Sequence, residues 1–328
     1  MMAGGAPPDP PARHHHPQHM TLTTPQPPRP AAPLLRDRSR RRVRRRIPWV
    51  ALVIALGFVL GVAVLLYPSA AAWFTQYQQS QRIDEYSSTM RDLAAESRHA
   101  AIEEAVTYNN ELVDGTTVLA AGENKPTADA AESTYDRLLL ADETGLMARI
   151  KIPAIDVDQP IYHGTSDETL KRGIGHLEGT ALPVGGASTH AVLTGHRGLA
   201  EAELFNNLDE LEIGDTFTIE VFGEVLTYQV MQTQVVQPNE TETLFPQRGM
   251  DLVTLVTCTP LGINSHRILV TGERILPTPV RELDAAGERP TIPGFPWWAL
   301  GLGGAVAAGG AYVWWSSRSP ASPAPSAR

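Results

Sequence analysis

Cysteine is nearly absent from this chain of 328 residues, in which Cys258 is the single example. One thiol cannot form an internal disulfide, so any exported domain must be held together by its core alone. About 130 residues suffice for such a core. A lone cysteine is usually a small buried apolar residue, so the sequence around Cys258 must decide whether the thiol is reactive.

Charge is absent from two segments of 21 residues, 47–67 and 295–315. A run of about 20 apolar residues can cross a membrane as a helix. All six tryptophans lie at or near the ends of these segments, as interfacial belts predict: Trp49, Trp73, Trp297, Trp298, Trp314 and Trp315. We expect two transmembrane helices. The alternatives are a cleaved signal peptide for the first segment, before the small residues 69–72, and a glycine-rich tail for the second.

Basic residues gather at the N-terminus, where residues 1–46 hold ten arginines against Asp9 and Asp37. Because this cluster directly precedes the first apolar segment, it indicates membrane orientation rather than nucleic-acid binding. We expect both termini in the cytoplasm and residues 68–294 outside. Residues 1–35 are rich in proline and alanine, which predicts disorder. A histidine run in such a tail has no fixed geometry, so we expect no metal at His14, His15, His16 and His19, and no cofactor.

Cys258 ends a run of β-branched residues, 251–258, that stops at a turn signal, Thr259–Gly262. Ser265–Thr271 reads as the next strand, and the six-residue link before it favours an antiparallel pair. Arg267 would then lie beside Cys258. Upstream, the predicted strand Thr189–Thr194 runs into His196. The sequence therefore predicts that cysteine, histidine and arginine converge.

These three side chains would suit acyl transfer. A thiolate at Cys258 is an effective nucleophile, and His196 can stabilise it as a cation and later protonate a departing amine. Arg267 carries a permanent charge and five donors for a substrate carbonyl or an oxyanion. No acidic third member is evident. The alternative is a structural loop histidine and a surface arginine.

Short β-rich runs fill residues 147–276, with turn signals between them. Such spacing predicts a mainly β fold, an antiparallel barrel or sandwich. The runs centre on Ile150, Ile161, Ala191, Phe217, Thr227, Val235, Leu255 and Leu269.

Several ordered blocks resemble sortases, the cell-surface cysteine transpeptidases of Gram-positive bacteria. The central blocks are Leu193–Gly198, Thr254–Cys258 and Arg267. Further blocks at 150–153, 160–164, 173–180 and 182–186 resemble the class C, pilin-polymerising branch. The resemblance covers about residues 146 to 276. It implies an eight-stranded sortase-type β-barrel with N-terminal helices and a groove over Cys258.

The resemblance also implies an activity. Cys258 would cleave a Leu-Pro-x-Thr-Gly-like sorting signal between Thr and Gly, and a lysine amine of a pilin would resolve the thioester. Thr194, Thr257 and His176 are the candidates for substrate binding. We expect His163, His176, His190 and His266 to be mainly structural, with His176 as the one that could also line the groove. The partners implied are surface proteins with sorting signals, pilins above all. The alternatives are a housekeeping-like sortase that anchors proteins to the cell wall, and a non-catalytic module that binds sorting signals.

One departure concerns the lid that typically covers the site in class C sortases. Its anchor there is Asp-Pro followed by an aromatic residue, but Ala120, Ala121 and Gly122 stand at the expected position. We therefore expect an open site with an accessible Cys258. The alternative is that a neighbouring residue replaces the anchor.

The expected organisation follows from these patterns. It comprises a disordered basic tail (1–46), a transmembrane helix (47–67), a helical stalk (68–107), a lid-like loop region (108–146), the catalytic barrel (147–276), a linker (277–294), a second transmembrane helix (295–315) and a cytoplasmic tail (316–328).

Overall fold

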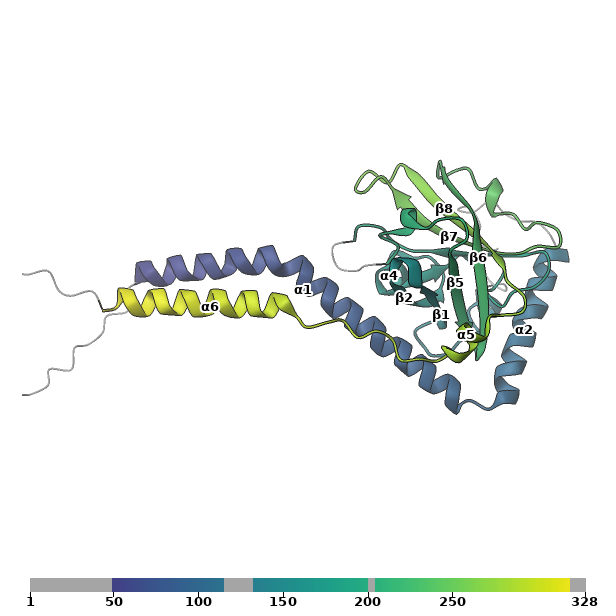
Figure 1. Cartoon of the computed structure of the whole chain (residues 1–328), viewed down its shortest axis with the longest axis horizontal. Helices are drawn as coiled ribbons and strands as arrows, with labels where there is room; N and C mark the ends of the chain where they lie inside the picture. Colours follow the sequence, from purple (N-terminus) through teal and green to yellow (C-terminus); the bar gives the residue numbers. More distant parts are fainter. Residues whose placement is uncertain (1–48, 115–131, 200–203, 319–328) are drawn as a thin grey trace, which may run out of the picture. The chain divides into compact units, whose positions relative to one another are not determined.

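A computed structural model describes residues 49–114, 132–199 and 204–318, and Figure 1 shows its elements. The predicted disordered tail and the expected lid anchor at Ala120, Ala121 and Gly122 lie outside the described residues.

The catalytic region is a closed barrel of eight strands in the order β1-β2-β3-β4-β7-β8-β6-β5. Their bounds are β1 Leu146–Ile152, β2 Val157–His163, β3 Ile174–His176, β4 Thr189–Thr194, β5 Thr216–Val221, β6 Glu224–Val236, β7 Asp251–Thr259 and β8 His266–Arg274. The predicted β-barrel is therefore observed.

Two details of the strand prediction are wrong. The barrel is mixed rather than antiparallel, because β2 pairs with β3 and β4 with β7 in parallel. The runs around Thr227 and Val235 form one strand, β6, whose register shifts between Val230 and Gln232. The missing eighth strand is β3, which has three residues and is too short to show a period.

The helices are longer than predicted. Helix α1, Trp49–Asp92, passes through Pro68 without a break, so the expected span and the first part of the stalk are one helix. Helix α2, Ala95–Asp114, continues past residue 108, where we expected a loop, because Gly115 is the first strong helix breaker. Short helices α3 Glu132–Tyr135, α4 Asp167–Arg172 and α5 Val280–Asp284 follow, with 3₁₀ turns η1 Pro153–Ile155, η2 Leu208–Glu210 and η3 Glu242–Leu244.

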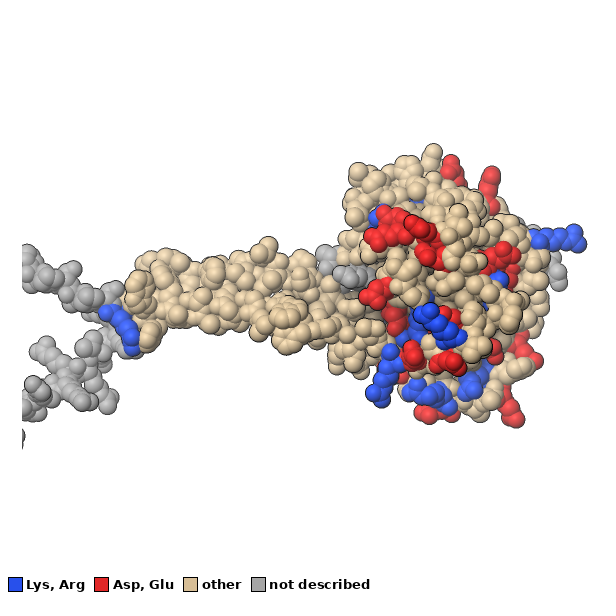
Figure 2. All heavy atoms as spheres, in the orientation of Figure 1, with Lys and Arg blue, Asp and Glu red and all other residues tan. Residues whose placement is uncertain are grey.

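Helix α6, Trp297–Ser316, packs against α1 through small residues. A Cβ added at Gly309 would lie 3.5 Å from the Ala55 Cβ, and Ala51 and Ala305 are buried. Figure 2 shows α6 and the part of α1 that packs on it bare of acidic and basic side chains, whereas the barrel carries many; the charged residues of α1 begin at Arg82. Among the helices described, α1 alone combines the length and hydropathy of a membrane span.

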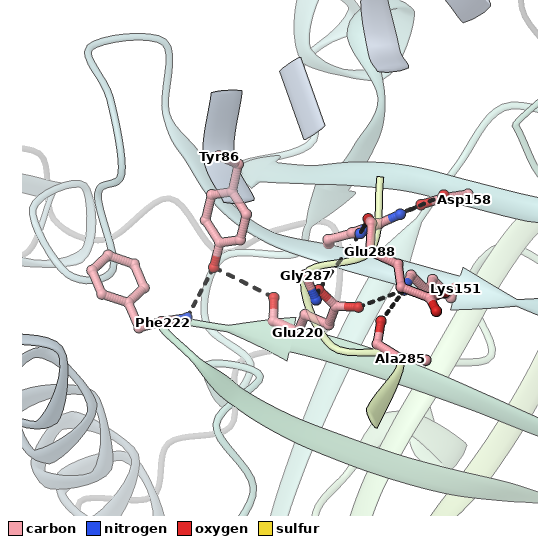
Figure 3. A network of polar contacts seen from close by, with 9 residues as sticks. Tyr86, Lys151, Asp158, Glu220, Phe222, Ala285, Gly287 and Glu288 are labelled. Carbon is pink, nitrogen blue, oxygen red and sulfur yellow. Dashed lines mark hydrogen bonds and ion pairs between the residues drawn. The ribbon is translucent and has the colours of Figure 1, made fainter. Parts of the chain in front are cut away.

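The barrel wall formed by β1, β2 and β5 holds a buried network of paired charges (Figure 3). Arg149, whose side chain is 1% exposed, donates to Asp158 from Nε and Nη2 at 2.7 and 2.6 Å. Lys151 Nζ lies 2.7 Å from Glu220 Oε1. Two cations thus face two carboxylates, so no charge in the network is buried without an opposite partner.

The same network holds the segment that leads to α6. Arg149 Nη1 donates to the carbonyl of Glu288 at 2.7 Å, and Lys151 Nζ donates to that of Ala285 at 2.9 Å. The backbone N–H of Gly287 donates to Glu220 in return. Residues predicted to be a plain linker are therefore part of the domain. On the other side, the Tyr86 hydroxyl of α1 accepts from Phe222 N at 2.9 Å.

Glu220→Gln tests the structural weight of this network. Removing one carboxylate leaves two buried cations with a single acidic partner, so we expect the free energy of unfolding to fall by about 3 kcal/mol. Urea unfolding of the full chain in detergent, followed by near-ultraviolet circular dichroism, measures the change. Glu224→Gln, an exposed carboxylate at the start of β6, is the matched control and should change little. If Glu220→Gln and Glu224→Gln changed the free energy of unfolding by the same amount, the buried network would make no specific contribution to stability.

Candidate active site

Three neighbouring strands carry the reactive residues of the candidate active site. Cys258 of β7 lies directly opposite Arg267 of β8, as the short link between them predicted. On the other side of β7, Thr194 at the end of β4 pairs with Val256. The ladder continues one step further, since the N–H of Gly195 donates to the Val256 carbonyl at 3.0 Å. His196 is the next residue, so its backbone lies alongside Cys258.

Strand alternation puts the reactive side chains on the outer face of the barrel. Leu193, Leu255 and Val270 point inward and belong to the main core. Their neighbours Val192, Val256 and Leu269 form a separate outer cluster covered by Leu244. Because successive side chains point to opposite faces, Cys258 and Arg267 share the outer face with Val256 and Leu269. Cys258 and Arg267 are cross-strand partners on this face. Together with His196, two residues beyond the end of β4, they make up what we call the reactive row.

Close packing fixes the backbone before His196. A Cβ at Gly195 would lie 2.6 Å from the Phe205 ring and 2.8 Å from Ile174, so no larger residue fits there. The Thr257 hydroxyl donates to the Gly195 carbonyl at 2.7 Å. The His196 carbonyl accepts from Phe205 N at 3.1 Å. These contacts fix the chain at His196 relative to β7.

Arg197 is a positioning residue that the sequence analysis passed over. Its Nε donates to the Asn206 carbonyl at 2.9 Å, Nη1 to the Thr259 hydroxyl at 3.2 Å, and Nη2 to Asp209. It thereby joins the segment after His196 to the residue after Cys258. The sequence signal that could have identified Arg197 is its position directly after His196.

Arg267 is half-buried, and its guanidinium is turned toward its own loop. Nη1 donates to the carbonyls of Asn264 and His266, both at 3.0 Å. These two bonds use both hydrogens of Nη1. The three hydrogens on Nε and Nη2 have no partner among the described residues, and they are the donors that remain for a substrate oxygen.

The two threonines proposed as substrate-binding residues differ in position. Thr194 is half-buried on the outer face, in the same line as His196, and stays a candidate. Thr257 is fully buried, because it alternates with Cys258 and its hydroxyl is bonded to Gly195. A direct side-chain contact between Thr257 and substrate is therefore not available in this structure.

His176 is buried rather than exposed in a groove, so its side chain is not available as a substrate-binding residue. Its side chain is fully buried, and Nε2 donates to the Ala181 carbonyl at 2.8 Å. Nδ1 lies 2.8 Å from the Tyr135 hydroxyl, so the ring is a neutral imidazole that accepts from Tyr135. Tyr135 ends α3, and this bond fixes the point where the chain rejoins the barrel.

The loop between β6 and β7 is held over the outer face by a chain of hydrogen bonds. His190 Nδ1 donates to the Phe245 carbonyl at 3.1 Å, and Nε2 lies 2.7 Å from the Thr254 hydroxyl. Thr254 in turn lies 2.8 Å from the Thr271 hydroxyl. His190 is thus structural. So is His163, whose ring nitrogens contact two backbone carbonyls, whereas His266 is exposed and bonds to Ser265.

Three described cavities of about 270 to 330 Å³ lie away from this row, and the one of about 330 Å³ lies beside Ile213 and Met231. One of about 310 Å³ lies between α1, the start of α2 and the β5–β6 turn, beside Arg98 and Gly223. Another of about 270 Å³ is lined by polar residues that include Asp156 and Asn207. None of these cavities is lined by Cys258, His196 or Arg267.

Comparison with known proteins identifies the family. The sortase domain family matches residues 150–275. The structure resembles sortase C1 from Streptococcus agalactiae, with 38% identity and a TM-score of 0.56 over 60% of this chain and 100% of that one. It also resembles sortase C from Streptococcus pneumoniae, with 38% identity and a TM-score of 0.51 over 60% of this chain and 96% of that one; that structure is described in terms of catalysis and pilin substrate specificity. Sortase D from Bacillus subtilis is 28% identical over 45% of this chain and 74% of its own length. The chain belongs to the sortase family, and it is a cysteine transpeptidase.

The buried His176 predicts a pH dependence of stability. Burial lowers the pKa of His176 to about 4, whereas an unfolded histidine titrates near 6.5. Between these two pKa values the unfolded state binds a proton at His176 and the folded state does not. The contribution of the neutral ring to the free energy of unfolding is therefore fully present above pH 6.5, and it falls by about 3 kcal/mol as the pH drops to 4.

Urea midpoints across this pH range measure the effect. His176→Gln keeps a donor for the Ala181 carbonyl but cannot titrate, so we expect a flatter profile between pH 6.5 and 4. His99→Gln, at an exposed position on α2, is the control and should keep the full slope. A slope that survives His176→Gln unchanged would contradict the assignment.

Proposed function

We propose that this protein joins protein chains by cleaving a Leu-Pro-x-Thr-Gly-like sorting signal between Thr and Gly and transferring the acyl part to a lysine amine of a pilin subunit. The observation that carries this proposal is the placement of Cys258 opposite Arg267, with His196 just beyond the end of the neighbouring strand β4.

The mechanism follows from the chemistry of the row. The Cys258 thiolate attacks the threonine carbonyl carbon, and donors of Arg267 stabilise the oxyanion that forms. His196 then gives a proton to the glycine nitrogen as the peptide bond breaks, which leaves a thioester on Cys258. An incoming amine loses a proton to His196 and attacks the thioester. A new amide forms, and the thiolate is released.

Pilin polymerisation is the finer part of the proposal. It is supported by the likeness to class C sortases, one of which is described by its pilin substrate specificity. The alternative is transfer of surface proteins to a cell-wall amine. Mass spectrometry of the joined product separates the two. A product joined to a pilin lysine contains a pilin peptide, whereas a product joined to the cell wall contains a peptidoglycan fragment, and the two differ in mass.

The membrane arrangement is also a proposal. Helix α1 has the length and hydropathy of a span, and the arginines at 40–46 would keep its start in the cytoplasm. Helix α6 is less hydrophobic because of its glycine and alanine content, but it packs on α1 through Gly309 and Ala305. Small residues at a helix contact are typical of packing within membranes. We infer two spans with the barrel outside.

Cys258→Ala tests the nucleophile. Removal of the thiol should lower the rate of joining a sorting-signal peptide to an amine by about 10³-fold or more, while the urea midpoint hardly changes. His196→Ala should have a similar effect on turnover. His266→Ala is the matched control, since this exposed histidine beside Arg267 has no proposed role. Joining by the Cys258→Ala protein would refute the assignment.

Protease treatment of intact protoplasts tests the two spans. We expect the protease to remove the barrel and to spare epitope tags at both termini, because an even number of spans returns the C-terminus to the cytoplasm. Lysed protoplasts are the control, in which both tags should be lost. Loss of the C-terminal tag from intact protoplasts would mean that α6 does not cross.

A further inference from the structure

Strand β6 extends beyond its neighbour β5 toward the reactive row (Figure 1). Pairing between β5 and β6 runs from Val221 opposite Glu224 to Thr216 opposite Gln229. The chain before β5 adds one further step, where Val230 exchanges hydrogen bonds with Gly214 and Asp215. Pairing of β6 with β8 continues to Val236. Residues 231–236 therefore have a partner strand on one side only.

The hydrogen-bond pattern shows which backbone groups face the free side. The N–H and C=O groups of Val230 point toward β5. In a strand these groups point to opposite sides at successive residues, and the register shift between Val230 and Gln232 moves this alternation by one residue. Gln232, Gln234 and Val236 therefore bond to β8. The N–H and C=O groups of Thr233 and Val235 point away from the sheet.

The free edge is exposed to solvent. Val235 is 62% exposed, and Thr233 is exposed as well. Among the described residues, no hydrogen bond reaches the outward N–H and C=O groups of these two positions. The run Met231–Val236 carries no charge and no proline. Charged residues and proline usually protect the edge of a sheet from pairing with another strand. Because this edge has neither, it can serve as a template for an added strand.

The edge ends next to the reactive row. Val236 lies opposite Arg267, and Arg267 lies opposite Cys258. A strand added to β6 would be three strand spacings, about 14 Å, from the line of Cys258. The four residues of a sorting signal that precede the cleaved bond span about 13 Å when extended. Residues just before the signal can therefore reach the edge while the threonine is at Cys258.

We propose that Thr233 and Val235 form a strand-addition site for the segment of a substrate protein that directly precedes its sorting signal. The proposal rests on the function proposed above and names a second point of contact with the same substrate. The recognised chemistry is an extended, uncharged main chain that supplies two acceptors and two donors. Main-chain recognition of this kind tolerates different side chains, so several substrates could share the site.

The β6 edge lies next to the reactive row, and this favours the substrate segment over a second copy of the chain as the strand that binds there. The segment before the signal stays covalently attached to the acyl part, so it remains near Cys258 through both steps of the reaction. Its effective concentration at the edge is therefore high, and a weak contact of two residues suffices.

Val235→Pro tests the site without disturbing the barrel. Proline removes an outward N–H and blocks strand addition, but it leaves the bonds of Gln234 and Val236 to β8. The matched control is Val235→Thr, which changes the side chain and keeps the N–H. Each full-length protein is assayed with a five-residue signal peptide and with a peptide that carries eight additional uncharged residues before the signal.

We expect the unchanged protein and Val235→Thr to prefer the long peptide by about tenfold in kcat/KM, through a lower KM. Val235→Pro should lose this preference and keep its activity on the short peptide, which shows that the protein is folded and active. Thr233→Pro should behave in the same way.

Equal preference for the long peptide in all variants would overturn the strand-addition site and leave the proposed function intact. Absence of joining with both peptides in the unchanged protein would instead refute the proposed function. If Val235→Pro abolished a cross-linked dimer of the full chain and left the peptide preference unchanged, the edge would bind a second copy and the proposal would be wrong.

Discussion

The hydrogen-bond register of β7 between β4 and β8 is the constraint on which the site depends. Pairing of β7 with β8 places Cys258 opposite Arg267. Pairing of β7 with β4 places the backbone of His196, which follows β4, alongside Cys258. A slip of one residue in either ladder would turn the corresponding side chain into the core. The alternation is enforced by burial on both faces, since Leu255 packs inside and Val256 packs under Leu244 outside. The reactive row therefore owes its geometry to ordinary packing in the strands that carry it.

The rest of the chain keeps this sheet in place and connects it to its anchors. The paired charges of Arg149, Lys151, Asp158 and Glu220 bind the segment before α6, and the Tyr86 hydroxyl binds α1 to Phe222, directly after β5. Buried ion pairs contribute little net stability compared with apolar packing, but loss of one partner is costly because it leaves an uncompensated buried charge. In this protein they fix where the two helical segments leave the barrel. The outer face that carries Cys258 is left free of both.

The pairing of Cys258 with Arg267 could be predicted from the sequence because short-range order determines it. The turn Thr259–Gly262 made β7 and β8 antiparallel neighbours, and that alone placed Arg267 beside Cys258. The same period-two alternation would have excluded Thr257 as a groove residue, had it been applied to that residue. The fully buried position of His176 depends on contacts with Tyr135 and Ala181, which come from separate loops and leave no local pattern. The parallel pairing of β4 with β7 likewise joins strands that are far apart in the chain.

Capture of the acyl-enzyme tests the account most directly. The full-length protein is mixed with a sorting-signal peptide in the absence of an amine acceptor, quenched in acid and digested for mass spectrometry. The account predicts that the fragment containing Cys258 gains the mass of the peptide up to its threonine, and that hydroxylamine removes this mass. Cleavage of the peptide between Thr and Gly with the adduct on another residue, or with no adduct at any time, would contradict it.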